Sequence, residues 1–132
     1  MDVGDWKLEA GERRPIQSYE DLDVYKRSMS LVRPVHDLVK RFPEYEERDL
    51  VQQMRRASKS VPANIAEGFS KRRGVKDFKL YLAHALGSAN ELLVHLQVAH
   101  ELGYVEPEER DPLTEGYTIV CRQLNKLIQN WR

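Results

Sequence analysis

Apolar residues recur along this chain in steps of three and four, the spacing that places side chains on one face of an α-helix. The longest run predicts a helix over residues 75–102. Its apolar seam consists of Phe78, Leu82, Ala85, Ala89, Leu92, Leu96 and Ala99. Tyr81, Leu86 and Leu93 add a second flank, so the apolar arc is wider than one packing seam requires. Gly103 follows as a candidate left-handed helix cap.

The same spacing predicts three further helices. The helix over residues 47–71 has a seam of Leu50, Met54, Ala57, Val61, Ile65 and Phe69. The last helix has a seam of Leu113, Tyr117, Val120, Leu124, Leu127 and Trp131, and it begins either at Pro107 or after Asp111. The helix over residues 19–41 has a main stripe of Leu22, Tyr25, Met29, Val32, His36 and Val39, which Val35, Leu38 and Phe42 widen.

Local signals define the ends of these elements. Ser18 is a good N-cap for the first helix. Pro34 lacks the amide that would bond to Ser30, so we expect a bend there. Short links between long helices make sequential neighbours antiparallel. The sequence therefore predicts an all-α protein, an antiparallel up-down-up-down four-helix bundle over residues 18–132, preceded by a flexible tail over residues 1–17. Trp6 and Ile16 of that tail are expected to dock on the bundle.

Composition narrows the class of protein. The chain has 132 residues, 21 basic against 21 acidic side chains and a single cysteine, Cys121. A lone thiol is typical of a reducing compartment, and the sequence contains no apolar run of membrane-spanning or signal-peptide length, so a cytoplasmic location without membrane contact is expected. Because no phosphate loop, paired-cysteine motif or nucleophile motif occurs, we predict no enzyme activity, no catalytic residue and no cofactor.

Two predicted helices carry polar stripes that antiparallel packing would bring together. One stripe consists of Arg56, Ser60, Asn64, Glu67 and Lys71, and the other of His84, Ser88, Glu91 and His95. A metal or acid–base site is one interpretation, but di-metal bundles use Glu-x-x-His on two helices, and Glu91 and His95 are one residue too far apart. A hydrogen-bonded layer that sets helix register or a subunit contact is the interpretation we favour, and no metal is predicted.

Small residues gather on the same helices. Gly87 lies in mid-helix, where glycine costs about 1 kcal/mol relative to alanine. Close backbone approach would offset this cost, either within the monomer or between subunits, and the sequence leaves both open.

Charge is unevenly distributed. The segment from Arg55 to Lys79 contains two acids and eight basic residues, which are Arg55, Arg56, Lys59, Lys71, Arg72, Arg73, Lys76 and Lys79. The segment from Glu101 to Glu115 has six acids and one arginine. We expect the basic segment to form a surface at one end of the bundle, where it can neutralise phosphates. The alternatives are a solvated face or pairing with the acidic segment of another subunit.

Two strings of residues resemble a known family. They are SVPANIAEGF at residues 60–69 and LGSANEL at residues 86–92, with Phe42-Pro43 and Arg55-Arg56-Ala57 as supporting matches. They are similar to a bacterial four-helix bundle family encoded within intervening sequences of 23S ribosomal RNA genes, which is related to the accessory variability protein of diversity-generating retroelements. The resemblance implies a ring-like homopentamer and, from the retroelement branch, nucleic-acid binding and a reverse transcriptase as partner. It implies a structural signature of Asn64, Glu67, Gly68, Gly87, Ser88 and Glu91, with the eight basic residues as nucleic-acid candidates.

Three hypotheses for function result. The first is a non-catalytic oligomeric protein that associates with RNA or DNA through its basic surface. The second is a protein-interaction scaffold without a nucleic-acid role, which the broad apolar arc of residues 75–102 favours. The third is a metal-dependent bundle enzyme built on His84, Glu91 and His95.

Overall fold

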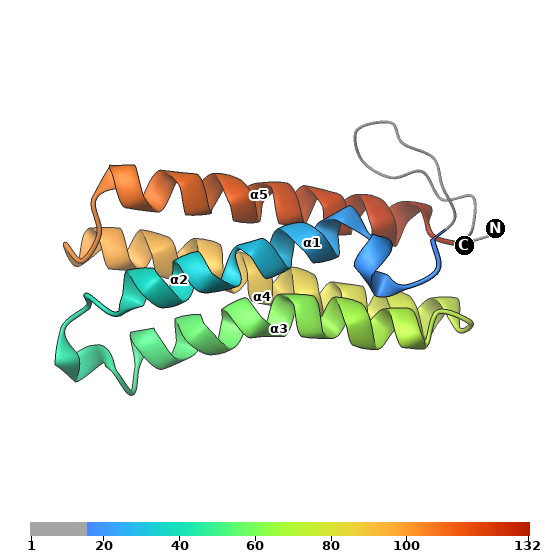
Figure 1. Ribbon diagram of the computed structural model, residues 1–132, viewed down its shortest axis with the longest axis horizontal. Coiled ribbons are helices and arrows are strands. Elements are labelled where there is room, and N and C mark those ends of the chain that lie inside the picture. Colours follow the sequence, from blue (N-terminus) through green and yellow to red (C-terminus); the bar gives the residue numbers. More distant parts are fainter. Residues whose placement is uncertain (1–15) are drawn as a thin grey trace.

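The computed structural model describes residues 16–132, and α-helices account for most of them (Figure 1). The α-helices are α1 (Asp23–Ser30), α2 (Val32–Val39), α3 (Leu50–Ser70), α4 (Val75–Glu101) and α5 (Pro107–Asn130). Two 3-10 turns, η3 (Tyr19–Asp21) and η4 (Glu44–Glu46), precede α1 and α3. No strand occurs among the described residues.

The helices form the predicted antiparallel bundle, with α1 and α2 lying end to end as its first member (Figure 1). The α1–α2 pair packs against α3 and α5, and α4 packs against α3 and α5 from the other side. The α1–α2 pair and α4 therefore occupy diagonal positions. The chain reverses direction at each connection, so the α3–α4 turn lies at one end and η4 and the α4–α5 turn lie at the other.

The predicted bend near Pro34 is a complete break at Leu31. Pro34 has no amide to donate to the Ser30 carbonyl, and the Leu31 amide instead donates to Ser28 O at 3.3 Å. Because α2 restarts at Val32, Pro34 falls in a first turn, where its missing donor costs no helical hydrogen bond. Across the break, Gly116 of α5 makes room: a Cβ there would lie 2.8 Å from Leu31 Cδ2. The prediction of one continuous helix over residues 19–41 was thus wrong.

The main apolar stripe predicted for this segment was only partly correct. Leu22 and Val39 are buried, as are the three residues predicted to widen the stripe, Val35, Leu38 and Phe42. Met29 is 47 % exposed, and Tyr25, Val32 and His36 are only partly buried. The buried side of α1 and α2 consists of Val24, Ser28, Val35, Leu38 and Val39. Ser28 tolerates burial because its hydroxyl donates to Tyr25 O at 2.9 Å.

The other three seams are confirmed, since every seam residue predicted for α3, α4 and α5 is buried. Gly103 has a positive φ of 79°, and the Tyr104 amide donates to Ala99 O at 2.8 Å, which closes the predicted left-handed cap. The last helix begins at Pro107, where Glu106 and Glu109 form a reciprocal capping box. The alternative start after Asp111 was wrong, and Pro112 lies inside α5.

The N-terminal predictions are met in part. Ser18 caps the 3-10 turn η3, accepting a hydrogen bond from the Glu20 amide. Ile16 is buried in the core, as predicted, whereas Trp6 and most of the proposed tail lie outside the described residues. Within residues 16–132, no helix has the length and apolar character required to cross a membrane.

Candidate functional site on the α3–α4 hairpin

The α3–α4 hairpin is held close at the end nearest its turn by a glycine. A Cβ on Gly68 would lie 2.7 Å from the Cβ of Tyr81 and 3.3 Å from the carbonyl oxygen of Phe78. Beside this contact, the rings of Phe69 and Phe78 pack edge to face with centroids 6.0 Å apart. Only glycine leaves room for α4 at this point, which gives a physical role to one member of the predicted signature.

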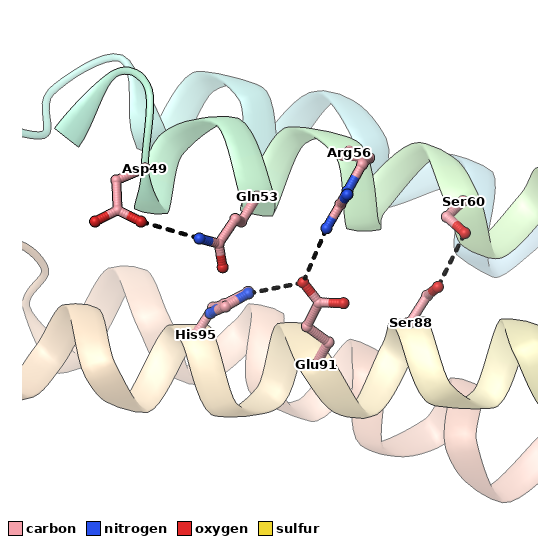
Figure 2. Close-up of polar contacts among 7 residues, drawn as sticks. All are labelled: Asp49, Gln53, Arg56, Ser60, Ser88, Glu91 and His95. Atoms are coloured by element: carbon pink, nitrogen blue, oxygen red, sulfur yellow. Dashed lines mark hydrogen bonds and ion pairs between the residues drawn. The ribbon is translucent and has the colours of Figure 1, made fainter.

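The two predicted polar stripes meet where the helices face each other (Figure 2). The Ser88 hydroxyl donates to Ser60 Oγ at 2.9 Å across the pair. Asn64 Nδ2 lies 2.9 Å from both the carbonyl and the hydroxyl oxygen of Ser60, one turn earlier on α3. These side chains satisfy one another, so the contact sets the register of α3 against α4.

Glu91 is the centre of the second part of this polar face (Figure 2). His95 Nε2 lies 2.9 Å from its carboxylate, and Arg56 of α3 lies 4.0 Å from the same oxygen. Arg56 is about three-quarters exposed, so its ion pair contributes at most about 1 kcal/mol. Nearby, Gln53 donates to Asp49 at 2.9 Å. The predicted hydrogen-bonded layer is present, with an arginine held only loosely at its edge.

Of the three groups proposed for metal binding, Glu91 and His95 pair with each other, but His84 does not join them. His84 is exposed and makes an edge contact with the Tyr81 ring at 6.0 Å. Within residues 16–132, no three His, Cys, Asp or Glu side chains come close enough to hold a metal ion. Cys121 is half-buried, and desolvation raises the pKa of its thiol, while Sγ lies 3.4 Å from Asn90 Oδ1. That environment disfavours the thiolate, the reactive form of cysteine.

Four of the eight basic candidates already have partners. Arg55 pairs with Glu47 at 2.8 Å, Arg56 with Glu91, and Lys71 with Glu67 at 3.5 Å. The Arg72 guanidinium stacks 4.1 Å from the centroid of the Phe69 ring and donates to the Phe69 carbonyl at 3.0 Å. Arg72 therefore caps the end of α3 in addition to carrying charge.

The other four candidates form no ion pair or hydrogen bond within the described part of the chain. They are Lys59, Arg73, Lys76 and Lys79. Arg73, Lys76 and Lys79 gather at the α3–α4 turn, and Lys59 lies 14 residues before Arg73, roughly 20 Å along the helix axis. Arg55 and Arg56 lie still farther from the turn, in the first third of α3. The prediction of one basic surface at one end of the bundle was wrong for Arg55, Arg56 and Lys59, because they lie along α3 at a distance from the turn.

Gly87 does not mediate a close helix approach within the monomer, which was one of the two alternatives left open by the sequence. A Cβ added there would have no neighbour within 4 Å. The close approaches occur at Gly68 and Gly116 instead. Sequence spacing does not distinguish a glycine that contacts a neighbouring helix from one that faces outward.

Two features escaped the sequence reasoning. At the end opposite the basic turn, the Tyr104 hydroxyl donates to Glu46 at 2.7 Å, and the other carboxylate oxygen of Glu46 accepts from the Leu50 amide at 3.4 Å. The pKa of Tyr104 is raised, mainly by the hydrogen bond with the Tyr45 hydroxyl at 3.1 Å and next by the hydrogen bond with Glu46. No periodic signal marks Glu46, because it lies in a 3-10 turn.

The second missed feature is an open groove of about 340 Å³ between α2 and α5. Pro34, Leu38, Pro112 and Leu113 contribute its apolar lining. Asp37, Arg41 and Glu109 complete it, and Arg41 pairs with Glu109 across the two helices. The two prolines, which lie within helices and line the groove, were the available sequence signal.

Comparisons with known proteins agree with this architecture. The chain is similar in structure to the crystal structure of a protein of unknown function from the S23 ribosomal protein family of Bacteroides thetaiotaomicron, with a TM-score of 0.72 and 23 % identity over 81 % of this chain and 99 % of that one. At that identity, the similarity concerns the fold. No match was found among curated proteins. Residues 20–126 match the family model described as 23S rRNA-intervening sequence protein. The chain belongs to the 23S rRNA-intervening sequence protein family.

Proposed function

We propose that the protein is a non-catalytic, cytoplasmic subunit of a ring-like homopentamer that binds RNA or DNA with the basic side chains at its α3–α4 turn. The observation that carries the proposal is the lack of partners for Arg73, Lys76 and Lys79 within the described residues. A cation that already pairs with a carboxylate must give up that pair to bind a phosphate, whereas a free cation only releases counterions. The three turn residues are therefore the principal phosphate contacts.

The opposite end of the bundle supports this orientation. The segment from Glu101 to Glu115 and the turn η4, which contains Glu44 and Glu46, lie together at that end (Figure 1). Their carboxylates repel a phosphate backbone, so a nucleic acid approaches the bundle from the α3–α4 turn.

Two matched triple variants test the proposal. One neutralises the free cations, as Arg73→Gln, Lys76→Gln and Lys79→Gln. The other neutralises the paired ones, as Arg55→Gln, Arg56→Gln and Lys71→Gln, and removes the same formal charge. Binding of labelled single-stranded RNA is measured at several salt concentrations, where each lost phosphate contact reduces the log–log slope by about 0.7.

The first triple variant is expected to reduce the slope by about 2 and the second by less than half as much. Circular dichroism verifies that both variants are folded. Absence of RNA and DNA binding by the unmodified protein at low salt would refute the proposed role. Equal losses in the two variants would show that net charge, and not the free turn residues, governs binding.

The assembly is tested separately by its mass. Five copies of a 15.4-kDa chain give a particle of about 77 kDa, which light scattering after size exclusion distinguishes from a monomer or dimer. A monomer at micromolar concentration would contradict the pentamer without bearing on RNA binding.

A protein-interaction scaffold is the second candidate, favoured by the exposed apolar side chains on the outer face of α4. The partner class that the family resemblance implies is a reverse transcriptase. Association that survives nuclease treatment, together with failure to bind RNA and DNA directly, would favour this candidate over the first.

A further inference from the structure

The outer face of α4 is unusually apolar for a surface that no other helix covers. Leu80, Val94, Val98 and Leu102 are between 38 and 54 % exposed. They form one stripe along the helix, with Gly87 exposed at its middle. Among the described residues, only two other large apolar side chains are so exposed, Met29 on α1 and Tyr45 in η4.

The middle of this stripe is a notch. Gly87 has no neighbour within 4 Å at its Cβ position, and Val94 stands on the same face two turns later. Glycine weakens a helix interior relative to alanine. Its presence here therefore has no explanation in contacts made within residues 16–132, but it leaves space for a side chain from outside.

Met29 lies on the helix diagonal to α4 and at the same level along the bundle. The rings of Phe42 and Tyr104 are 5.2 Å apart, which places these two residues at one level. Met29 lies 10 residues before the end of α2 at Val39, and Glu91 lies 10 residues before the end of α4 at Glu101, about 15 Å from each end. Met29 is thus level with Glu91, between Gly87 and Val94.

This matching of levels has a consequence for assembly. A head-to-tail contact closes into a ring when neighbouring copies are related by rotation alone, and it generates an open helix when they also shift along the axis. When each copy has two apolar surfaces on different sides at equal height, one surface of a copy meets the other surface of the next copy without such a shift. Charge is compatible with the same contact, because Lys26 lies one turn before Met29, and Glu91, whose arginine partner Arg56 is 4.0 Å away and mostly exposed, borders the stripe.

We propose that a second copy of this chain covers the outer face of α4, with Met29 of one copy seated in the Gly87–Val94 notch of the next. The inference rests on the self-association in the proposed function and assigns its contact surfaces. Each copy uses both surfaces, so the contact is heterologous, and their equal height means that successive copies do not shift along the ring axis.

Cysteine cross-linking tests the pairing directly. In full-length Cys121→Ser protein, Met29→Cys and Val94→Cys variants are prepared separately and then mixed under mild oxidation. A disulfide-linked dimer is expected only in the mixture, and the double variant is expected to form a ladder of linked chains. Efficient cross-linking of Val94→Cys with itself would show a face-to-face pair and would overturn the proposal.

Charge substitution provides the second measurement. Val94→Glu and Met29→Glu place a carboxylate in the contact and are each expected to raise the dissociation constant on the order of ten-fold or more. Thr118→Glu adds the same charge to an exposed position on α5 and is expected to leave assembly unchanged.

The outcomes separate the two proposals. If the unmodified protein assembles, but Val94→Glu assembles equally well and no mixed disulfide forms, the α4 contact is refuted while the pentamer stands. If the unmodified protein is monomeric by light scattering, self-association itself is refuted. The RNA-binding measurement is independent of both results.

Discussion

Replacing Gly68 with alanine is expected to destabilise the protein, even though alanine is the better helix former by about 1 kcal/mol. The added methyl would lie 2.7 Å from Tyr81 Cβ and 3.1 Å from a ring carbon of Phe78. Tyr81 Cβ is fixed to the backbone of α4, so no rotamer change relieves the clash and the two helices must separate. Overpacking of this kind costs about 1–3 kcal/mol. With the propensity gain of about 1 kcal/mol subtracted, the expected net loss in free energy of unfolding is up to about 2 kcal/mol.

Gly87→Ala is the matched control, because it has the same propensity gain and no neighbour within 4 Å. It is expected to stabilise the monomer by about 1 kcal/mol. Both variants are compared by urea unfolding in the Val94→Glu background, which removes the proposed contact between copies from the comparison. The midpoint should fall for Gly68→Ala and rise for Gly87→Ala at an unchanged m-value. Midpoints that move in the same direction would refute the assignment of Gly68 as the closest α3–α4 contact.

Three further outcomes are expected. Tyr117→Phe should raise the free energy of unfolding by about 1 kcal/mol, because the Tyr117 hydroxyl is fully buried without a hydrogen-bond partner among the described residues; a lower urea midpoint would contradict this. The Glu106 amide and, second, Arg41 lower the pKa of Glu109, so the ionised Glu109 stabilises the fold above pH 4.5, and this stabilisation is lost as the pH falls through the folded pKa. Glu109→Gln should therefore flatten the acid side of the profile of unfolding free energy against pH, and an unaltered profile would count against the ion pair. Burial raises the pKa of Cys121, so alkylation by iodoacetamide at pH 8 should be slower in the folded protein than in urea, and equal rates would show an open thiol.

The sequence predicted the three long helices well because each has one dominant apolar stripe. The α1–α2 segment has two stripes at helical spacing, and periodicity alone does not rank them. One contains Met29 and the other contains Val24 and Val35. The structure distinguishes them: Val24 and Val35 are buried and Met29 is exposed, and Leu31 packs against Gly116 of α5.

The candidate site was predictable to the same limited extent. Spacing and antiparallel packing predicted that the stripes containing Ser60 and Ser88 would meet, and the structure shows that these two residues are in contact. The pairing of Arg56 with Glu91 could not be predicted in this way, because it depends on which side chains lie within 4 Å of each other across two helices. The distinction between free and paired cations, on which the proposed function depends, therefore came only from the structure.

The break at Leu31 affects how the protein folds during its synthesis. It leaves α1 and α2 with eight residues each, whereas isolated helices shorter than about 12–15 residues are marginal in water. Both owe their order to α3 and α5, which are synthesised after them. During synthesis, α3 supplies the first surface against which α1 and α2 pack and α5 supplies the second, so their packing is complete only after α5 has emerged from the ribosome.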